Sequence, residues 1–481
     1  MKMKTTRSLG SKATAALLAL TLSTMMTPAA AFAANDVNEK VAANATAQDY
    51  SGEFGNIAPK YGDICIDADA ANGHTATVTA KDLTTSENTA ITADTTTRGT
   101  IDINVNGVTS KQDNGIQARV DGDGTIKVST GDISSGEQGA GIWTSVDNRE
   151  VLIPESAITV KAGNVTADGE GVVIRPYMNS TITIETGNVK AKGDGVQVVA
   201  ENGGEARLTT GDITSDKYGM FIYVSEGSSV NALVTGTLSG AKAPISFFGS
   251  FFNNTNNFNL TVWKIQQSNG NIVTELARKQ SLEQQALGTD DRPENEPRWD
   301  PDSEFTAAES KSNYEKAINY IVKYVNPTAG GTVSVTRANG SSLDSIAGYE
   351  FGSAKQDEKI LLKVNVEDGY RIAGTFNGEE LLEGENGEYY LVIPKGGGVL
   401  LTVKLEKDDR ASLAGFESDE DAAAETKAVS ASAAASNGAA GKGAALASTG
   451  DTLPALPLAA LTLVTAMALL ATAWLARKPL Q

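Results

Sequence analysis

The stretch Thr125-Ile-Lys-Val-Ser-Thr-Gly-Asp-Ile133 returns further along the chain with the same order of residue types. Its other copies are Ala157-Ile-Thr-Val-Lys-Ala-Gly-Asn-Val165, Thr181-Ile-Thr-Ile-Glu-Thr-Gly-Asn-Val189 and Ala206-Arg-Leu-Thr-Thr-Gly-Asp-Ile213. The apolar residue that ends each copy marks a period, and these markers are Leu83, Val108, Ile133, Val165, Val189, Ile213 and Leu238. Successive markers are 25, 25, 32, 24, 24 and 25 residues apart. A period this constant indicates stacked supersecondary units rather than independent domains.

Each repeat unit alternates apolar and polar residues with period two. Ile126 and Val128 alternate with Lys127 and Ser129, which predicts a strand with one face turned inward. Gly-Asp or Gly-Asn then breaks the strand, because Gly tolerates positive φ and Asp or Asn hydrogen-bonds nearby backbone. A second short strand is expected after each break, at Gly141-Ile-Trp-Thr144, Gly171-Val-Val-Ile174, Gly195-Val-Gln-Val198 and Gly219-Met-Phe-Ile222.

No unit holds enough apolar residues to bury a face alone, so the units must stack about 4.8 Å apart. Seven or eight coils would make a rod of roughly 35 Å. The pattern resembles a right-handed parallel β-helix, whose handedness comes from that resemblance and from the usual crossover rule. We therefore predict an all-β chain with a β-helix at 62–266, preceded by a lead-in at 35–61. A β-sandwich of many short strands is the alternative fold, although sandwiches do not require near-identical coils at a fixed period.

Two irregular stretches modify the rod. The 32-residue interval predicts a coil with an excursion from Asp147 to Ser156. The aromatic-rich segment from Ile245 to Phe252, with Phe258 and Trp263, predicts the last coil and a hydrophobic cap over an otherwise open end.

A second β module is expected at 318–407, after a polar linker or excursion at 267–317. Its motifs Gly330-Gly-Thr-Val-Ser, Asp368-Gly-Tyr370 and Phe376-Asn-Gly378 resemble the small β-grasp-like repeats of bacterial surface proteins, the internalin B-repeat type. That resemblance implies a spacer or a weak interaction unit. Residues 408–447 are rich in Ala, Ser and Gly and predict a flexible stalk.

The N-terminal residues 1–34 have the layout of a secretory signal peptide. A positively charged start precedes an apolar stretch from Ala13 to Met26, which predicts a signal helix. The small-x-small sequence Ala31-Phe-Ala33 then provides a cleavage site. The mature chain is therefore expected outside the cell.

The C-terminal residues 446–481 contain Leu446-Ala447-Ser448-Thr449-Gly450, an apolar run at 453–476 and then Arg477 and Lys478. The apolar run is long enough for a transmembrane helix, with the basic end on the cytoplasmic side. This order resembles the cell-wall sorting signal of Gram-positive surface proteins, in a form similar to the LAxTG variant of high-GC species, since Ala447 stands where proline is usual. The resemblance implies that a sortase cuts between Thr449 and Gly450 and transfers the protein to peptidoglycan. A plain single-pass membrane anchor is the alternative.

Composition excludes several functions. The net charge of −19 argues against a nucleic-acid partner. With one histidine, His74, and one cysteine, Cys65, the chain has no multi-histidine or multi-cysteine zinc site and no disulfide framework. Asp67-Ala-Asp69 followed by Asn72-Gly73 misses the spacing of a calcium loop. We therefore expect no metal and no cofactor, a core position for Cys65 and a surface turn for His74.

An enzyme of the polysaccharide lyase or glycoside hydrolase class would need paired or clustered acids. Asp132, Asp194 and Asp212 are candidates, but Asp132 and Asp212 fall on the repeated turn position that Asn164 and Asn188 occupy in other coils. A structural role in the turn explains these better, so no catalytic residue is assigned. The alternative of a surface-anchored β-helical polysaccharide lyase or glycoside hydrolase stays open.

The preferred hypothesis is a non-catalytic, cell-wall-anchored surface protein whose rod binds a glycan or a host-surface ligand, as an adhesin or structural protein does. The ligand cannot be identified from sequence, because β-helix recognition combines side chains from several coils. Positions near the long coil that could contribute are Trp143, Arg149, Arg175 and Tyr177, with core packing the preferred role for Trp143.

Overall fold

The computed structural model describes residues 35–137, 139–147, 156–224, 227–247, 258–266, 272–275, 315 and 317–408. The signal segment 1–34, the sorting motif 446–450 and the apolar run 453–476 lie outside the described residues, as does Arg149. In the part of the chain that is described, no helix has the length and hydropathy of a membrane span. The regular elements of that part are all strands.

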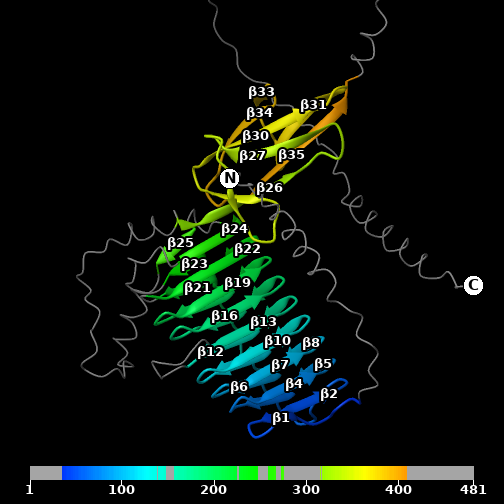
Figure 1. Cartoon of the computed structure of the whole chain (residues 1–481), viewed down its shortest axis with the longest axis vertical. Coiled ribbons are helices and arrows are strands. Elements are labelled where there is room, and N and C mark those ends of the chain that lie inside the picture. The colour runs from blue at the N-terminus through cyan, green and yellow to red at the C-terminus, as the bar shows by residue number, and fades with distance from the viewer. Residues whose placement is uncertain are drawn as a thin grey trace, which may run out of the picture. The chain divides into compact units, whose positions relative to one another are not determined.

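The chain folds as a parallel β-solenoid of about eight turns, in which each coil returns to lie above the previous one (Figure 1). One side is a sheet of ten parallel strands, here called the ten-strand face. Its strands are β1 Val41–Ala45, β3 Ile66–Ala70, β6 Ile91–Thr95, β9 Ile116–Val120, β12 Ile142–Val146, β15 Val172–Arg175, β18 Val196–Ala200, β21 Tyr218–Val224, β23 Ala243–Phe247 and β25 Val273–Glu275.

The other strands of the coils form two further parallel stacks. The second stack contains β2 Tyr50–Glu53, β4 Thr75–Thr79, β7 Thr100–Asn104, β10 Thr125–Ser129, β13 Ala157–Lys161, β16 Thr181–Glu185, β19 Glu205–Thr210, β22 Ser229–Gly240 and β24 Phe258–Ile265. The third contains β5 Asp82–Thr85, β8 Gly107–Ser110, β11 Ile133–Ser135, β14 Val165–Ala167, β17 Val189–Ala191 and β20 Ile213–Ser215.

Most coils therefore have three strands, whereas the sequence predicted two. From β11 onward, the missed strands directly follow Gly-Asp or Gly-Asn and are only three residues long. A three-residue strand shows too little alternation to be recognised from its sequence. The expected parallel β-helix is nevertheless confirmed, including the stacking of equivalent strands.

The core is a set of columns of inward-facing aliphatic side chains. Ile126 pairs in register with Ile101 in the coil before and Ile158 in the coil after, and all three are fully buried. The alternation predicted for this strand is confirmed, because Lys127 and Ser129 are exposed. Burial of these columns is the main favourable contribution to folding, since no disulfide is present in the described residues.

The solenoid starts earlier than residue 62. The expected lead-in at 35–61 contains β1 and β2, which pair in register with β3 and β4. In this first coil, Tyr50 and Phe54 pack against the core and are partly buried. A Cβ on Gly52 would lie only 2.6 Å from the Phe54 ring, so glycine leaves the room that the ring fills.

At the other end the solenoid continues beyond the predicted cap. Phe247 and Phe258 are buried core residues of β23 and β24, and their rings meet edge to face at 5.0 Å. Residues 248–252 lie outside the described residues. The next strand along this sheet is β26 Asn319–Val325, the first strand of the second module. It pairs parallel with β24, with Thr261 opposite Asn319 and Val262 opposite Tyr320. The second module therefore continues the sheet of the solenoid beyond β24.

The second module consists of two groups of mostly antiparallel strands. One group contains β26, β28 Asp344–Ser345, β29 Gly352–Lys355, β31 Tyr370–Asn377, β32 Glu380–Leu381 and β35 Val399–Lys407, with β26 and β35 parallel. The other contains β27 Gly331–Arg337, β30 Lys359–Val366, β33 Gly384–Glu385 and β34 Glu388–Val392. Tyr320 of β26 is fully buried and Lys323 lies 4.1 Å from the centre of the Trp263 ring, so the module is joined to the last coils by side chains as well as backbone.

Candidate binding surface on the ten-strand face

A column of Asn and Asp side chains follows the corner between the second and third stacks, here called the Gly-Asx corner. The side-chain oxygen of each residue accepts a hydrogen bond from the backbone N–H of its equivalent one coil later. The donor-to-acceptor distances are 2.7 Å for Asn164 N to Asp132 Oδ1, 2.9 Å for Asn188 N to Asn164 Oδ1, 2.8 Å for Asp212 N to Asn188 Oδ1 and 2.6 Å for Thr237 N to Asp212 Oδ1.

The glycine before each of these residues completes the Gly-Asx corner. A Cβ on Gly211 would lie 2.2 Å from Asn188 Oδ1, and one on Gly187 would lie 2.7 Å from Asn164 Oδ1. The side chain of one coil therefore occupies the space where the next coil would place its own Cβ. Gly and Asp or Asn recur together because they form one steric and hydrogen-bonding unit.

The candidate acids of the sequence lie at corners and not together in a cleft. Asp132 and Asp212 both serve the Gly-Asx corner, as their repeated position predicted. Asp194 lies at another corner, where it accepts a hydrogen bond from the backbone N–H of Tyr218 at 3.3 Å. Burial raises the pKa of Asp194, and this hydrogen bond opposes that shift. Three candidate acids are thus engaged by backbone groups of the next coil.

The side chains that alternate with the core positions of the ten-strand face form a grid over four successive coils, in which Val173 and Ser145 are buried. Register places Trp143, Val173, Gln197 and Phe221 in one column. Beside it, Ser145 pairs with Arg175, and on the next two coils Val199 pairs with Tyr223. Further along, Tyr177 pairs with Glu201. We call Trp143, Arg175, Glu201, Phe221 and Tyr223 the Trp143 patch.

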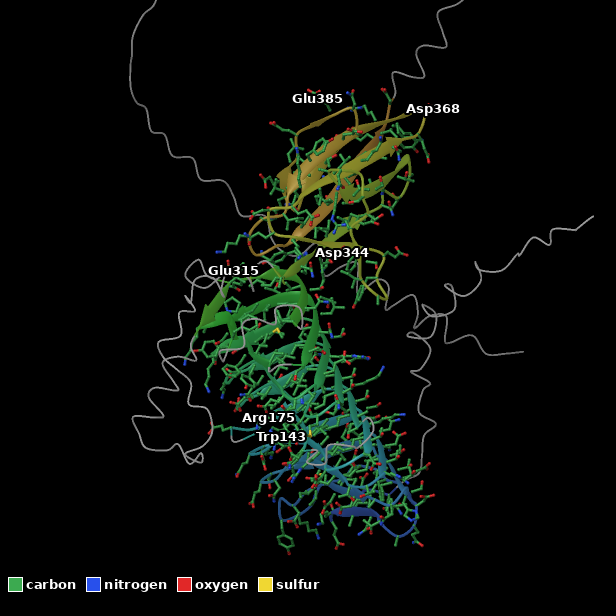
Figure 2. All side chains as sticks on the ribbon, turned by 60° about the vertical axis from the view of Figure 1, so that its left-hand side comes forward. Trp143, Arg175, Glu315, Asp344, Asp368 and Glu385 are labelled. Atoms are coloured by element: carbon green, nitrogen blue, oxygen red, sulfur yellow. The ribbon has the colours of Figure 1, made fainter. Side chains whose placement is uncertain are left out.

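Trp143 lies on the outside of the solenoid, so the core position preferred for it is wrong. Its neighbours Ile142 and Thr144 face inward and are fully buried, whereas Trp143 is half-buried. Arg175, on the next strand, is exposed and places its guanidinium carbon 6.0 Å from the centre of the Trp143 ring. Figure 2 shows the two side chains next to each other on the outer side of the coils. This contact has the geometry of a cation–π interaction.

Charges in and beside the Trp143 patch occur in opposite pairs. Burial raises the pKa of Glu201, and the positive charge of Arg175 opposes this shift. The pKa of the Tyr223 phenol is also raised, by burial and then by the charge of Glu201. One coil earlier, Arg119 Nε lies 2.9 Å from Asp147 Oδ2. These pairs leave the surface close to neutral while keeping hydrogen-bonding groups on it.

The N-terminal part of the same face is acidic instead. Asp69 and Asp94 are register neighbours, and burial followed by the charge of Asp69 raises the pKa of Asp94 to about 6. Asp67 pairs with Lys40 at 2.7 Å. No group of three or more His, Cys, Asp or Glu side chains in the described residues is arranged to hold a metal ion.

The single cysteine and the single histidine occupy the places expected for them. Cys65 is fully buried in the core, and burial raises its thiol pKa to about 12. His74 follows a turn and lies 3.4 Å from Asp49 Oδ1 at the surface. Neither side chain belongs to the Trp143 patch.

A shallow groove lies beside the Gly-Asx corner and is lined by Lys161, Asn164, Glu185 and Thr209. Its two charged groups pair with each other, since Lys161 Nζ is 2.9 Å from Glu185 Oε2. Asn164 serves the corner.

Of the positions expected to contribute to binding, Trp143 and Arg175 lie on neighbouring strands of one face, and Tyr177 forms an isolated bridge two residues past the end of β15. Sequence reasoning missed Glu201, Phe221 and Tyr223, which lie one or two coils further on. Counting one repeat forward from Arg175 and Tyr177 would have found Val199 and Glu201, and one more repeat forward from Val199 would have found Tyr223. Searches with the chain find no matching family model, no matching curated protein and no matching solved structure.

Proposed function

We propose that this protein is a non-catalytic surface protein whose β-solenoid presents a binding face outside the cell, as an adhesin or structural protein does. The observation that carries the proposal is the Trp143 patch, which gathers two aromatic rings, a phenol, a guanidinium and a carboxylate on four successive coils. Aromatic and Arg side chains are the residues most enriched where proteins bind partners.

The acids of the solenoid corners support the non-catalytic part of the proposal. Asp132 and Asp212 accept hydrogen bonds from backbone N–H groups, and their place in the column is taken by asparagine at 164 and 188. Asparagine cannot act as a general acid or base in that position. A structural role common to both residue types accounts for the whole column.

Surface attachment rests on the terminal sequences. In this proposal the signal peptide is removed after Ala33, a sortase cuts between Thr449 and Gly450, and the chain becomes linked to peptidoglycan. Mass spectrometry of protein released from the cell wall tests this step. A C-terminal peptide ending at Thr449 is expected, and a peptide still containing Arg477 would contradict sortase transfer.

Binding is tested by displaying the full chain on cells and measuring adhesion to glycans, mucin and host matrix proteins. Specific adhesion that is lost with Arg175→Ala is expected. Failure to bind any of these surfaces would contradict a binding function and leave a passive wall component.

A β-helical polysaccharide lyase or glycoside hydrolase is the second candidate. The observation that favours it is the raised pKa of Asp94, about 6, beside a second carboxylate, Asp69. A glycosidase acid needs such a raised pKa. A polysaccharide panel with reducing-end and unsaturated-product assays separates the two, because turnover abolished by Asp94→Asn, Asp194→Asn or Arg175→Ala would overturn the non-catalytic proposal.

A further inference from the structure

The second module covers one edge of β24, the last strand of the second stack. Two adjacent residues of β26, Asn319 and Tyr320, pair with Thr261 and Val262. Tyr320 is fully buried, so this contact belongs to the core as well as to the sheet. β26 therefore covers the part of the β24 edge where the module begins to pair.

A run of three glycines, residues 396–398, covers the next part of the same edge. The Gly398 N–H donates a hydrogen bond to the Trp263 carbonyl oxygen at 2.7 Å. The Ile265 N–H donates to the Gly396 carbonyl oxygen, also at 2.7 Å. Two segments of the module that are far apart in the chain thus engage one strand of the solenoid.

Gly397 lies at the closest approach between the module and β24. It forms an antiparallel bridge with Lys264, and a Cβ on it would lie 2.2 Å from Tyr320 Cδ1 and 2.8 Å from the Trp263 carbonyl oxygen. Gly340, elsewhere in the module, also has a positive φ, but a Cβ there would have nothing within 4 Å. A change to alanine strains the backbone at both positions, and only at Gly397 does it press the module away from β24.

A lysine also fastens the module to two strands of the solenoid. The Lys323 ammonium donates a hydrogen bond to the Thr235 carbonyl oxygen of β22 at 3.0 Å and lies 4.1 Å from the centre of the Trp263 ring of β24. Lys359 makes a similar contact with the Tyr390 ring at 4.4 Å, but on β30, which pairs with other strands of the module. Lys359 therefore provides a matched control for Lys323.

An uncovered β24 edge would be suited to pairing with another strand. β24 is eight residues long, and Lys264 is its one charged residue. Long edges with few charges pair readily with other chains, and proteins block them by covering them. In an antiparallel pairing of β24 with a second copy, centred between Thr261 and Val262, Lys264 would face Asn259 of the second copy, so no like charges would meet.

We propose that the second module is the end cap of the solenoid and keeps the β24 edge from pairing with a second copy of this chain. The resemblance found in the sequence implied a spacer or a weak interaction unit. A spacer needs no contact with the coils, whereas a stack of repeats needs a covered end to stay soluble. This inference does not depend on the proposed binding function.

Hydrogen–deuterium exchange of the full-length chain in mild detergent tests the attachment. Gly397→Ala should speed exchange in the β24 peptide that contains Ile265 about tenfold, whereas Gly340→Ala should leave it unchanged. Lys323→Ala should also speed this exchange, and Lys359→Ala should not. Equal exchange in Gly397→Ala and Gly340→Ala would overturn the inference, because the module would then not protect the edge.

Sedimentation velocity of the same variants over a range of concentrations tests what pairs with the edge. Gly397→Ala should form dimers as concentration rises, whereas wild type and Gly340→Ala should not, and association through the apolar run 453–476 would be the same in all three. Adding Thr261→Lys to Gly397→Ala places a charge on the edge and should abolish the dimers. Lys323→Ala provides the same comparison if Gly397→Ala does not fold. Fast exchange in β24 without dimers would overturn the inference.

Discussion

The Gly-Asx corner and the Trp143 patch lie on the same coils but differ in how their residues recur. At the corner, the same two residue types return in coil after coil, because each side chain must bond the backbone of the next coil and needs a glycine beside it. At the patch, each coil contributes a different side chain, and none repeats in its column. We infer that repetition here reflects the needs of the fold, and that variation on one outward face is free to serve binding.

The largest effect is expected from Gly211→Ala at the Gly-Asx corner. The new Cβ would lie 2.2 Å from Asn188 Oδ1, so that oxygen must leave the position from which it accepts the Asp212 N–H. We expect a loss of about 2–3 kcal/mol in the free energy of unfolding, measured by urea denaturation. Asn188→Ala alone should cost about 1 kcal/mol.

The double variant Gly211→Ala/Asn188→Ala provides the control. Because Asn188→Ala removes the clashing oxygen, the double variant should be no less stable than Gly211→Ala alone. Additive losses would show that the glycine and the asparagine act separately and that the proposed unit is wrong.

The second effect concerns the acidic part of the ten-strand face and depends on pH. Burial and the neighbouring Asp69 raise the pKa of Asp94 to about 6, against the opposing charge of Arg119, with Asp67 also nearby. The Asp94 carboxyl therefore binds a proton more tightly in the folded chain than in the unfolded chain. Stability should be greatest below the unfolded pKa and should fall as pH rises through about 6.

The pH effect can be measured by thermal unfolding between pH 4 and pH 8. Asp94→Asn should reduce the loss of stability between about pH 4 and pH 6 and stabilise the chain at pH 7 by roughly 1 kcal/mol, allowing for the partial exposure of the group. A loss of stability at pH 7 in Asp94→Asn would contradict this prediction, because it would mean that the carboxylate makes a net favourable contact in the folded chain.

A smaller effect on the free energy of unfolding is expected at Gly107, where the Gly-Asx corner lacks its Asp or Asn. Gly107 pairs in register with Asp82 and precedes Val108, so it occupies the position held by Asp132 one coil later. A Cβ there would lie 3.2 Å from Asp82 Oδ1 and 3.7 Å from the Asp132 carbonyl oxygen. Gly107→Asn should therefore add a bond to the column and stabilise the chain by about 0.5 kcal/mol. Gly107→Ala is the control, and equal stability of the two variants would contradict the prediction.

The smallest effect on folding is expected from Arg175→Ala in the Trp143 patch. Arg175 is exposed and its contact with Trp143 is at the outer limit of a cation–π interaction. The free energy of unfolding should change by less than about 0.5 kcal/mol. A larger loss in chemical denaturation would mean that the patch also holds the coils together, and the contrast with the corner would weaken.

The sequence predicted those parts of the fold that repeat. The period marked by Ile133, Val165 and Val189 gave the parallel stack, and the turn role of Asp132 followed from Asn164 in the next copy. Ser134 and its two neighbours were missed as a strand because three residues show too little alternation.

The parts that do not repeat could not be predicted in the same way. Ile142 and Trp143 are adjacent apolar residues, so alternation alone does not decide which one faces the core. Glu201 and Tyr223 join Arg175 only through the register between coils. The pairing of β24 with β26 depends on chain segments more than fifty residues apart, for which the sequence carries no local signal.

Hydroxyl-radical footprinting of the full-length chain, with and without a glycan or matrix protein to which the displayed chain adheres, tests the central claim most directly. The account predicts that oxidation of Trp143, Tyr177 and Tyr223 falls on binding, whereas oxidation of Tyr50 in the first coil and Tyr390 in the second module does not change. Protection of Tyr50 or Tyr390 with no protection of Trp143 would contradict it, because the ligand would then bind away from the ten-strand face.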